Sequence, residues 1–170
     1  MSELYQGPTL SSLLLRALRR WGDRPAFSGH GPTLTYAQAL DLIGRYQAVM
    51  MANGVKRGDR MALLNSNRAD AYLAGIAAVS LGACMTPLHP LGSLDDHLFI
   101  MDDARIDHLL VDAGAYLERG AELAGVERLQ KVFTTGPADY GIDLAAAADQ
   151  TGSVTAKDLA LPSDEAWIVY

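Results

Sequence analysis

Residues 55–64 read VKRGDRMALL, and this stretch decides the fold class. Gly58-Asp59 is a turn signal, and the apolar run from Arg60 to Leu64 that follows has the length of a buried strand. Helical patterns come before and after it, which places the strand between two helices. A buried strand between helices is typical of an α/β domain whose sheet is covered on both faces.

The same alternation continues along the chain. It predicts helices over residues 10–21, 36–53, 68–81, 93 onward and 113–124, and strands over residues 25–28, 33–35, 60–64, 84–87, 106–111, 130–134 and 167–170. We therefore expect a largely parallel sheet flanked by helices, with residues 167–170 as one more buried strand. Residues 136–150 carry the weakest pattern and are expected at the surface, and residues 29–32 are expected to form a turn.

Short polar residues mark where the helices begin. Thr9 and Asn67 are predicted to cap the first and third helices. Thr35 with Gln38 forms a capping box, in which each side chain satisfies a backbone N–H group. Ser93 with Asp96 signals another helix start, which explains the pair Asp95-Asp96 as capping and dipole compensation. The pair Asp102-Asp103 is expected to be balanced by Arg105 or by solvent.

Composition excludes several classes of function. The 170 residues carry a formal net charge of −6, and the most basic local group, Arg16, Arg19 and Arg20, is expected to be a solvated helix face. A nucleic-acid partner is not expected, because phosphate neutralisation needs clustered cations. The single cysteine fits a reducing cytoplasm. No signal peptide is visible, and residues 71–90, broken by Gly and Pro, are expected to be a buried helix and strand rather than a membrane span.

Familiar catalytic and metal-binding motifs are missing from the sequence. There is no Gly-rich phosphate loop, no H-E-x-x-H pair and no G-x-S-x-G elbow. No metal site is expected, because none of the four histidines pairs closely with Cys84 or with another histidine. His89 is predicted to be structural, Cys84 an inert buried thiol, and the pair Met50-Met51 core filling. The residues alone predict an α/β domain without a visible active site.

Several segments, in order, resemble the adenylate-forming (AMP-binding) superfamily, which includes acyl-CoA synthetases. The segments are GDRPA at residues 22–26, LTY at 34–36, VKRGDRMALL at 55–64, LGACMTPLHP at 81–90, LLVD at 109–112 and PSDEAWIVY at 162–170. The last resembles the strand that leads into the Thr/Ser/Gly-rich phosphate loop of the family. The resemblance implies that residues 1–170 are the amino-terminal part of the large AMP-binding domain, truncated before that loop.

The resemblance implies a function for a longer parent polypeptide. The parent would be an ATP-dependent acyl-CoA ligase that uses ATP, Mg²⁺ and CoA and activates a hydrophobic carboxylic acid as an acyl-adenylate. The present chain would hold no catalytic residue, would be inactive alone and would bind no cofactor alone. Its partner would be the remaining carboxy-terminal part of the ligase.

One group of site residues is carried over from the family by position. His89, Pro90, Leu91 and Arg119 correspond to residues that lie near the CoA nucleotide in some members, although this chain lacks the Gly-rich sequence of those members at the first site. Two alternatives stay open. The chain could be a non-catalytic scaffold that docks a partner, or pairs with a second copy through an open sheet edge. It could also be a fragment of a peptide-synthetase adenylation domain.

Overall fold

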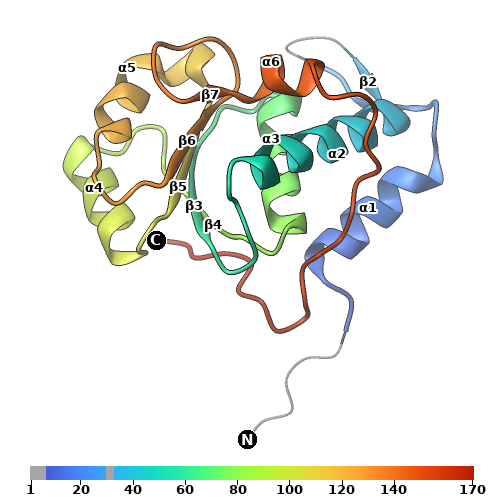
Figure 1. Cartoon of the computed structure of the whole chain (residues 1–170), viewed down its shortest axis with the longest axis horizontal. Helices are drawn as coiled ribbons and strands as arrows, with labels where there is room; N and C mark the ends of the chain where they lie inside the picture. Colours follow the sequence, from blue (N-terminus) through green and yellow to red (C-terminus); the bar gives the residue numbers. More distant parts are fainter. Residues whose placement is uncertain (1–6, 30–32) are drawn as a thin grey trace, which may run out of the picture.

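A computed structural model describes residues 7–29 and 33–170 of the chain (Figure 1). The predicted turn at residues 29–32 falls mostly outside this part. The helices are α1 (Leu10–Arg20), α2 (Tyr36–Ala52), α3 (Ala69–Ser80), α4 (Leu94–Asp103), α5 (Ala113–Ala124) and α6 (Leu144–Asp149). The strands are β1 (Pro25–Phe27), β2 (Leu34–Thr35), β3 (Arg60–Leu64), β4 (Cys84–Pro87), β5 (His108–Val111), β6 (Lys131–Thr134) and β7 (Ile142–Asp143).

Within the described residues, five strands form a parallel sheet in the order β4-β3-β5-β6-β7. Strands β1 and β2 form a separate antiparallel hairpin beside α2. Strand β3 is an interior strand next to the edge strand β4, and its Ala62 pairs with Thr86 of β4 on one side and with Leu109 of β5 on the other. The strand predicted within residues 55–64 is therefore paired on both sides, as a buried strand of a parallel sheet is.

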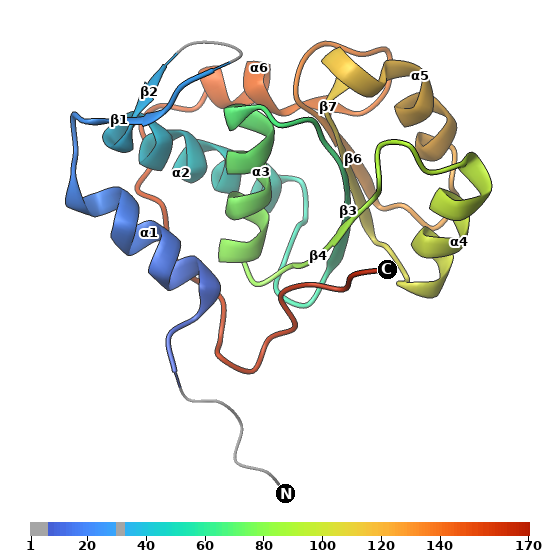
Figure 2. The same ribbon diagram turned by 180° about the vertical axis from the view of Figure 1, so that it is seen from behind.

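The two faces of the sheet are covered by different helices, as Figures 1 and 2 show. Helices α1, α2, α3 and α6 lie on one face, and α4 and α5 lie on the other. Alternate residues of each strand supply the two cores: Met61, Met85 and Phe133 face the first group of helices, and Ala62 and Leu109 face the second. This burial on both faces confirms the predicted α/β architecture.

Most of the predicted caps are observed. Thr9 accepts a hydrogen bond from the Ser12 amide, and Thr35 with Gln38 forms the expected capping box. Ser93 and Asp96 form a second capping box at α4, which confirms the reading of Asp95-Asp96. These motifs are local in sequence, so the pattern alone is sufficient to find them.

The predicted cap at Asn67 is wrong. Helix α3 begins one residue later than expected, and its N-cap, Arg68, makes no side-chain capping bond. The Arg68 guanidinium instead binds the carboxylate of Asp70, which also accepts a bond from the Ala71 amide at 3.1 Å. An acidic residue in the first turn thus satisfies the helix start in place of a capping side chain.

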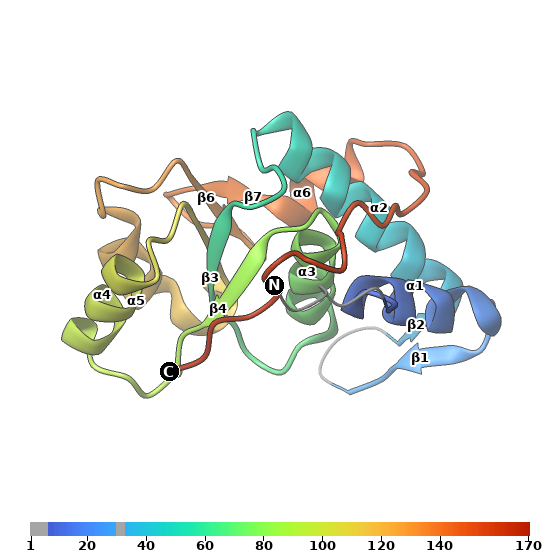
Figure 3. The same cartoon turned by 90° about the horizontal axis from the view of Figure 1, so that it is seen from below.

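The chain after α6 differs most from the prediction. Residues 136–150 were expected at the surface, but they contain β7 and α6, and Leu144 and Ala148 are fully buried. Residues 167–170 do not form a buried strand. Trp167 makes a parallel β-bridge to Met85 at the open edge of β4, and its side chain is 47% exposed. Figure 3 shows the end of the chain running beside β4 at the edge of the sheet.

Four smaller predictions are settled by burial and contacts. Cys84 is buried as expected. Of the methionine pair only Met50 fills the core, because Met51 is 49% exposed. Asp103 accepts a hydrogen bond from the Tyr170 hydroxyl, and not from Arg105. The three arginines of α1 are exposed, as expected for a solvated face. One of them, Arg19, also donates a hydrogen bond to the carbonyl of Ala156.

Candidate functional site

The carboxyl edge of the parallel sheet gathers polar side chains at one point. The strand order changes direction between β3 and β5, and such switch points are where open α/β sheets bind ligands. Asn65 and Ser66 follow β3, and Asp112 follows β5. The Ser66 hydroxyl donates a hydrogen bond to the buried Asp112 carboxylate, whose other oxygen accepts from the Gly114 amide at 3.1 Å. Asp112 is thus the cap of α5 and the link between the two strand ends.

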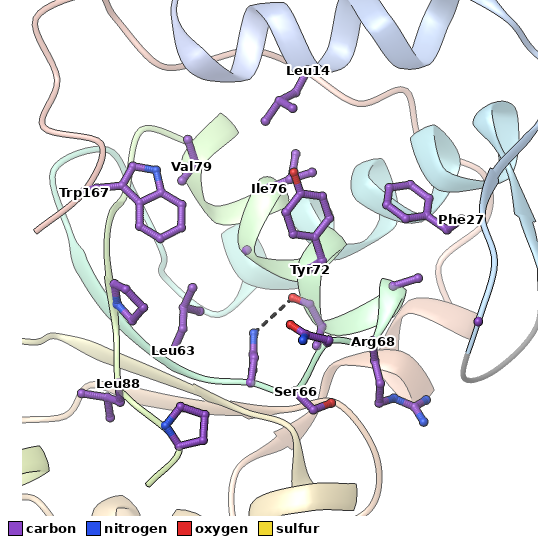
Figure 4. A pocket seen from close by; sticks show the side chains of 18 of the residues that line it. Leu14, Phe27, Leu63, Ser66, Arg68, Tyr72, Ile76, Val79, Leu88 and Trp167 are labelled. Atoms are coloured by element: carbon purple, nitrogen blue, oxygen red, sulfur yellow. Dashed lines mark hydrogen bonds between the residues drawn. The ribbon is translucent and has the colours of Figure 1, made fainter. Parts of the chain in front are cut away.

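An apolar groove opens beside this edge. It has a volume of about 1030 Å³ and runs between α1, the end of β1, α3 and the edge strand β4. Figure 4 shows Trp167 and Phe27 at its two sides, with Tyr72 between them. Tyr72 is 52% exposed and its ring centroid lies 5.9 Å from that of Phe27. We call this feature the apolar groove; its lining includes Leu14, Leu63, Ile76, Val79, Leu88 and Trp167.

The floor of the apolar groove ends in polar groups. The amide nitrogen of Asn65 donates a bond to the Ala71 carbonyl at 3.2 Å, while its oxygen is buried and, among the described residues, has no hydrogen-bond partner. Arg68 and Asp70 form an ion pair at 2.9 Å. Burial acts to raise the pKa of Asp70, but the hydrogen bond and charge of Arg68 outweigh it and lower that pKa.

Of the four residues carried over by position, His89, Leu91 and Arg119 are not part of the lining of the apolar groove, whereas Pro90 is. His89, Pro90 and Leu91 form an exposed loop between β4 and α4. Arg119 of α5 reaches this loop, because its Nη1 donates a hydrogen bond to the carbonyl of Gly92 at 2.9 Å. The structure therefore brings together residues that are 27 or more positions apart. Their role toward a nucleotide stays a prediction.

One residue of this arrangement has no counterpart among the predicted site residues. His97 is almost fully buried, and its ring lies within hydrogen-bond distance of both His89 and Arg119. The sequence did carry a signal: the capping box at Ser93 fixes the start of the helix, and His97 follows it on the face that α4 turns inward. A buried polar side chain requires partners, so a histidine on an apolar helix face indicates a specific contact.

Three further observations concern the thiol of Cys84, metal binding and membrane crossing. Burial is the main reason that the pKa of the Cys84 thiol is raised, which disfavours the nucleophilic thiolate. No three His, Cys, Asp or Glu side chains among residues 7–29 and 33–170 lie close enough together to hold a metal ion. In the same residues no helix has the length and apolar character that a membrane crossing requires.

The fold and this edge define a doubly wound α/β domain with its binding features at the carboxyl ends of the strands. The family profile described as "AMP-binding enzyme" matches residues 14–170, and the chain belongs to this family. It is 35% identical, over 154 residues, to the medium/long-chain-fatty-acid–CoA ligase FadD8 of Mycobacterium tuberculosis, with 86% of this chain and 27% of that protein aligned. It is 28% identical over 151 residues to a 3-hydroxybenzoate–CoA ligase of Aromatoleum, covering 87% of this chain and 28% of that protein.

Solved structures show the same fold at lower sequence identity. A long-chain-fatty-acid-CoA ligase from Archaeoglobus fulgidus superposes with a TM-score of 0.79 over 98% of this chain and 35% of its own, at 17% identity. The amide bond synthetase McbA from Marinactinospora thermotolerans gives a TM-score of 0.80 over 96% of this chain and 32% of its own, at 19% identity. The present chain spans between 27% and 35% of the length of these four relatives.

Proposed function

We propose that residues 1–170 form the amino-terminal part of a large AMP-binding domain, within an ATP-dependent acyl-CoA ligase. The observation that carries this proposal is the family match over residues 14–170, together with similarity to two proteins named as CoA ligases. The parent enzyme would convert a hydrophobic carboxylic acid first to an acyl-adenylate and then to a CoA thioester. The cytoplasmic location stays a prediction.

ATP would supply the adenylyl group, Mg²⁺ would offset phosphate charge, and CoA would supply the accepting thiol. Residues 1–170 contain no phosphate loop, so we expect this chain to be inactive alone and to bind none of the three alone. Its own contribution would lie in the loop of His89, Pro90 and Leu91 and in Arg119. A guanidinium that is 30% exposed beside an exposed loop is suited to a phosphate group, so these residues fit a nucleotide.

The apolar groove favours the remaining carboxy-terminal part of the ligase as the partner of this chain. That part could be joined to this chain or be a separate polypeptide. Exposed Tyr72 and Trp167 line a continuous apolar surface on α3 and the β4 edge. An exposed apolar surface of this kind can pack against a partner segment. The relatives are three to four times longer than the aligned region, which provides enough chain to cover it.

The test is an ATP–pyrophosphate exchange assay with a panel of fatty and aromatic acids. We expect no exchange by the 170-residue chain alone, and exchange followed by thioester formation when the chain is combined with the carboxy-terminal part from its native source. A mass spectrum of the native material identifies that part. Turnover by the chain alone would contradict its predicted inactivity, and no turnover by the complex with any acid would contradict the ligase proposal.

A second candidate is a scaffold that docks a partner without catalysis, which the apolar groove also favours. Edge pairing with a second copy is less favoured, because the Met85 amide and carbonyl on the open side of β4 already bond to Ala166 and Ile168 at 2.9 Å. A peptide-synthetase fragment is the third candidate, since surfactin synthase subunit 2 of Bacillus subtilis is 28% identical over 109 residues. Exchange with amino acids in place of fatty acids would favour it.

A further inference from the structure

His97 is a buried side chain that connects two parts of the candidate site. It lies in the second turn of α4, with 1% of its surface exposed. Its Nε2 is 2.8 Å from the carbonyl oxygen of His89, and its Nδ1 is 3.2 Å from Nη1 of Arg119. One imidazole therefore touches both the loop and the cation.

The two contacts determine where the imidazole carries its proton. A guanidinium can only donate hydrogen bonds, so Nδ1 of His97 must accept the bond from Arg119. The proton of the neutral ring is then on Nε2, which donates to the His89 carbonyl. Both contacts are satisfied by this tautomer and by no other form of the ring.

The same bonds restrict Arg119. Its Nη1 donates to both Gly92 and His97, and its Nε donates to the carboxylate of Glu122 at 2.7 Å. Within residues 7–29 and 33–170, Nη2 has no hydrogen-bond partner, and 30% of the side chain is exposed. The guanidinium is thus held on two sides and retains one nitrogen for a ligand.

The loop is held at the same places. The His89 carbonyl also accepts a bond from the Gly92 amide at 2.8 Å, and Nδ1 of His89 accepts from the Leu91 amide at 3.2 Å. Gly92 packs so closely that a Cβ atom there would lie 2.6 Å from Nε2 of His97. We call residues 89–92, His97 and Arg119 the loop clamp.

We propose that His97 is a positioning residue, which holds Arg119 and the loop of residues 89–92 in one arrangement for a phosphate-bearing ligand of the CoA type. This inference rests on the proposed function for the identity of the ligand. The loop clamp itself is inferred from the hydrogen bonds alone and does not depend on that function. His97 does not touch the ligand; it acts through Arg119 and the loop backbone.

The first experiment uses the ¹⁵N-labelled 170-residue chain. Long-range imidazole spectra should show the His97 proton on Nε2. The Gly92 amide should exchange with solvent about tenfold faster in His97→Leu, because one lost bond of about 1.4 kcal/mol opens the loop. His97→Gln keeps one donor and one acceptor, so its Gly92 exchange rate should lie between those of the unmodified chain and His97→Leu. Leu98→Ala, on the partly exposed side of α4, is the matched control and should leave this exchange unchanged.

Two results would overturn the loop clamp: a proton on Nδ1, or unchanged Gly92 exchange in His97→Leu. The tautomer is measured on the unmodified chain, so it decides the question even where a variant fails to fold.

The second experiment uses the ligase reassembled with its carboxy-terminal part. His97→Leu should raise the KM for CoA about tenfold, leave kcat and the KM for ATP unchanged, and be largely rescued by His97→Gln. An unchanged KM for CoA would overturn the positioning role. A wild-type complex that forms no thioester would overturn the proposed function and the assigned ligand together, whereas the expected tautomer and exchange would still support the loop clamp.

Discussion

Strand β4 ends between two regions of opposite character. On the α3 side lies the apolar groove, in which Tyr72 and Trp167 remain about half exposed. On the α4 side lies the loop clamp, in which His97 is buried and hydrogen-bonded at both nitrogens. Hydrogen bonds are satisfied pair by pair, so a few residues complete the loop clamp. Apolar area is removed from water only by another layer of chain, which is why we proposed a partner for the groove and not for the loop clamp.

The largest expected effect tests the tight packing of the loop clamp. Gly92→Ala places a Cβ 2.6 Å from Nε2 of His97 and 3.1 Å from the His89 carbonyl. Because His97 cannot move without losing its bonds, we expect a loss of about 2 kcal/mol in the free energy of unfolding. Urea unfolding measures it. An unchanged midpoint would mean that the loop adapts and that the clamp is not tightly packed.

The next effect concerns the segment that carries one wall of the groove. The side chain of Gln47, 3% exposed, donates to the Lys157 carbonyl at 2.7 Å and accepts from its amide at 2.9 Å. Gln47→Leu leaves both backbone groups unpaired, so we expect a loss of about 1.5 kcal/mol and faster proteolysis between residues 151 and 165. Met51→Leu, on an exposed part of the same helix, is the control for the proteolysis rate. Equal rates would show that other contacts hold the segment.

A smaller effect of opposite sign is expected in the groove. In α3, a Cβ at Gly75 would meet Leu63 at 3.6 Å and Met85 at 3.8 Å, which is ordinary contact. Gly75→Ala should therefore stabilise the isolated chain by about 0.5–1 kcal/mol, because alanine loses less backbone entropy in a helix. Thermal unfolding of Gly75→Ala and Gly92→Ala, each compared with the unmodified chain, measures the sign of the two stability changes. Destabilisation at both positions would remove the contrast between the two regions.

The smallest effect depends on pH. The pKa of Asp70 is lowered in the folded chain, so its stabilising contribution is present at neutral pH and is lost as the pH falls below about 4, through the folded value. Arg68→Met should reduce this loss, since it removes the hydrogen bond and charge that lower the pKa. Stability curves between pH 3 and 7 for the two proteins test it. Parallel curves would show that Asp70 does not depend on Arg68.

Local sequence patterns predicted much of the fold. The capping boxes at Thr35 and Ser93 and the strand after Gly58-Asp59 were found where the patterns indicated. These signals involve residues within a few positions of each other. The prediction failed at residues 167–170, because an apolar run has the same appearance whether it enters the sheet or lies along its edge.

The candidate site was predicted less completely. The resemblance to the adenylate-forming family selected His89, Pro90, Leu91 and Arg119, but it did not select His97. The bond from Arg119 to Gly92 joins α5 to a loop before α4, and only the packing of these elements creates it. The role of the four residues toward CoA remains to be measured.

The sequence by itself determined the family, the order of helices and strands and the helix starts, because short-range periodicity and capping chemistry are written in neighbouring residues. The tertiary structure alone decided which apolar residues stay uncovered and which polar ones meet. The exposure of Trp167 and the burial of His97 both depend on segments that are distant in the sequence. A local pattern does not show which distant segments pack together.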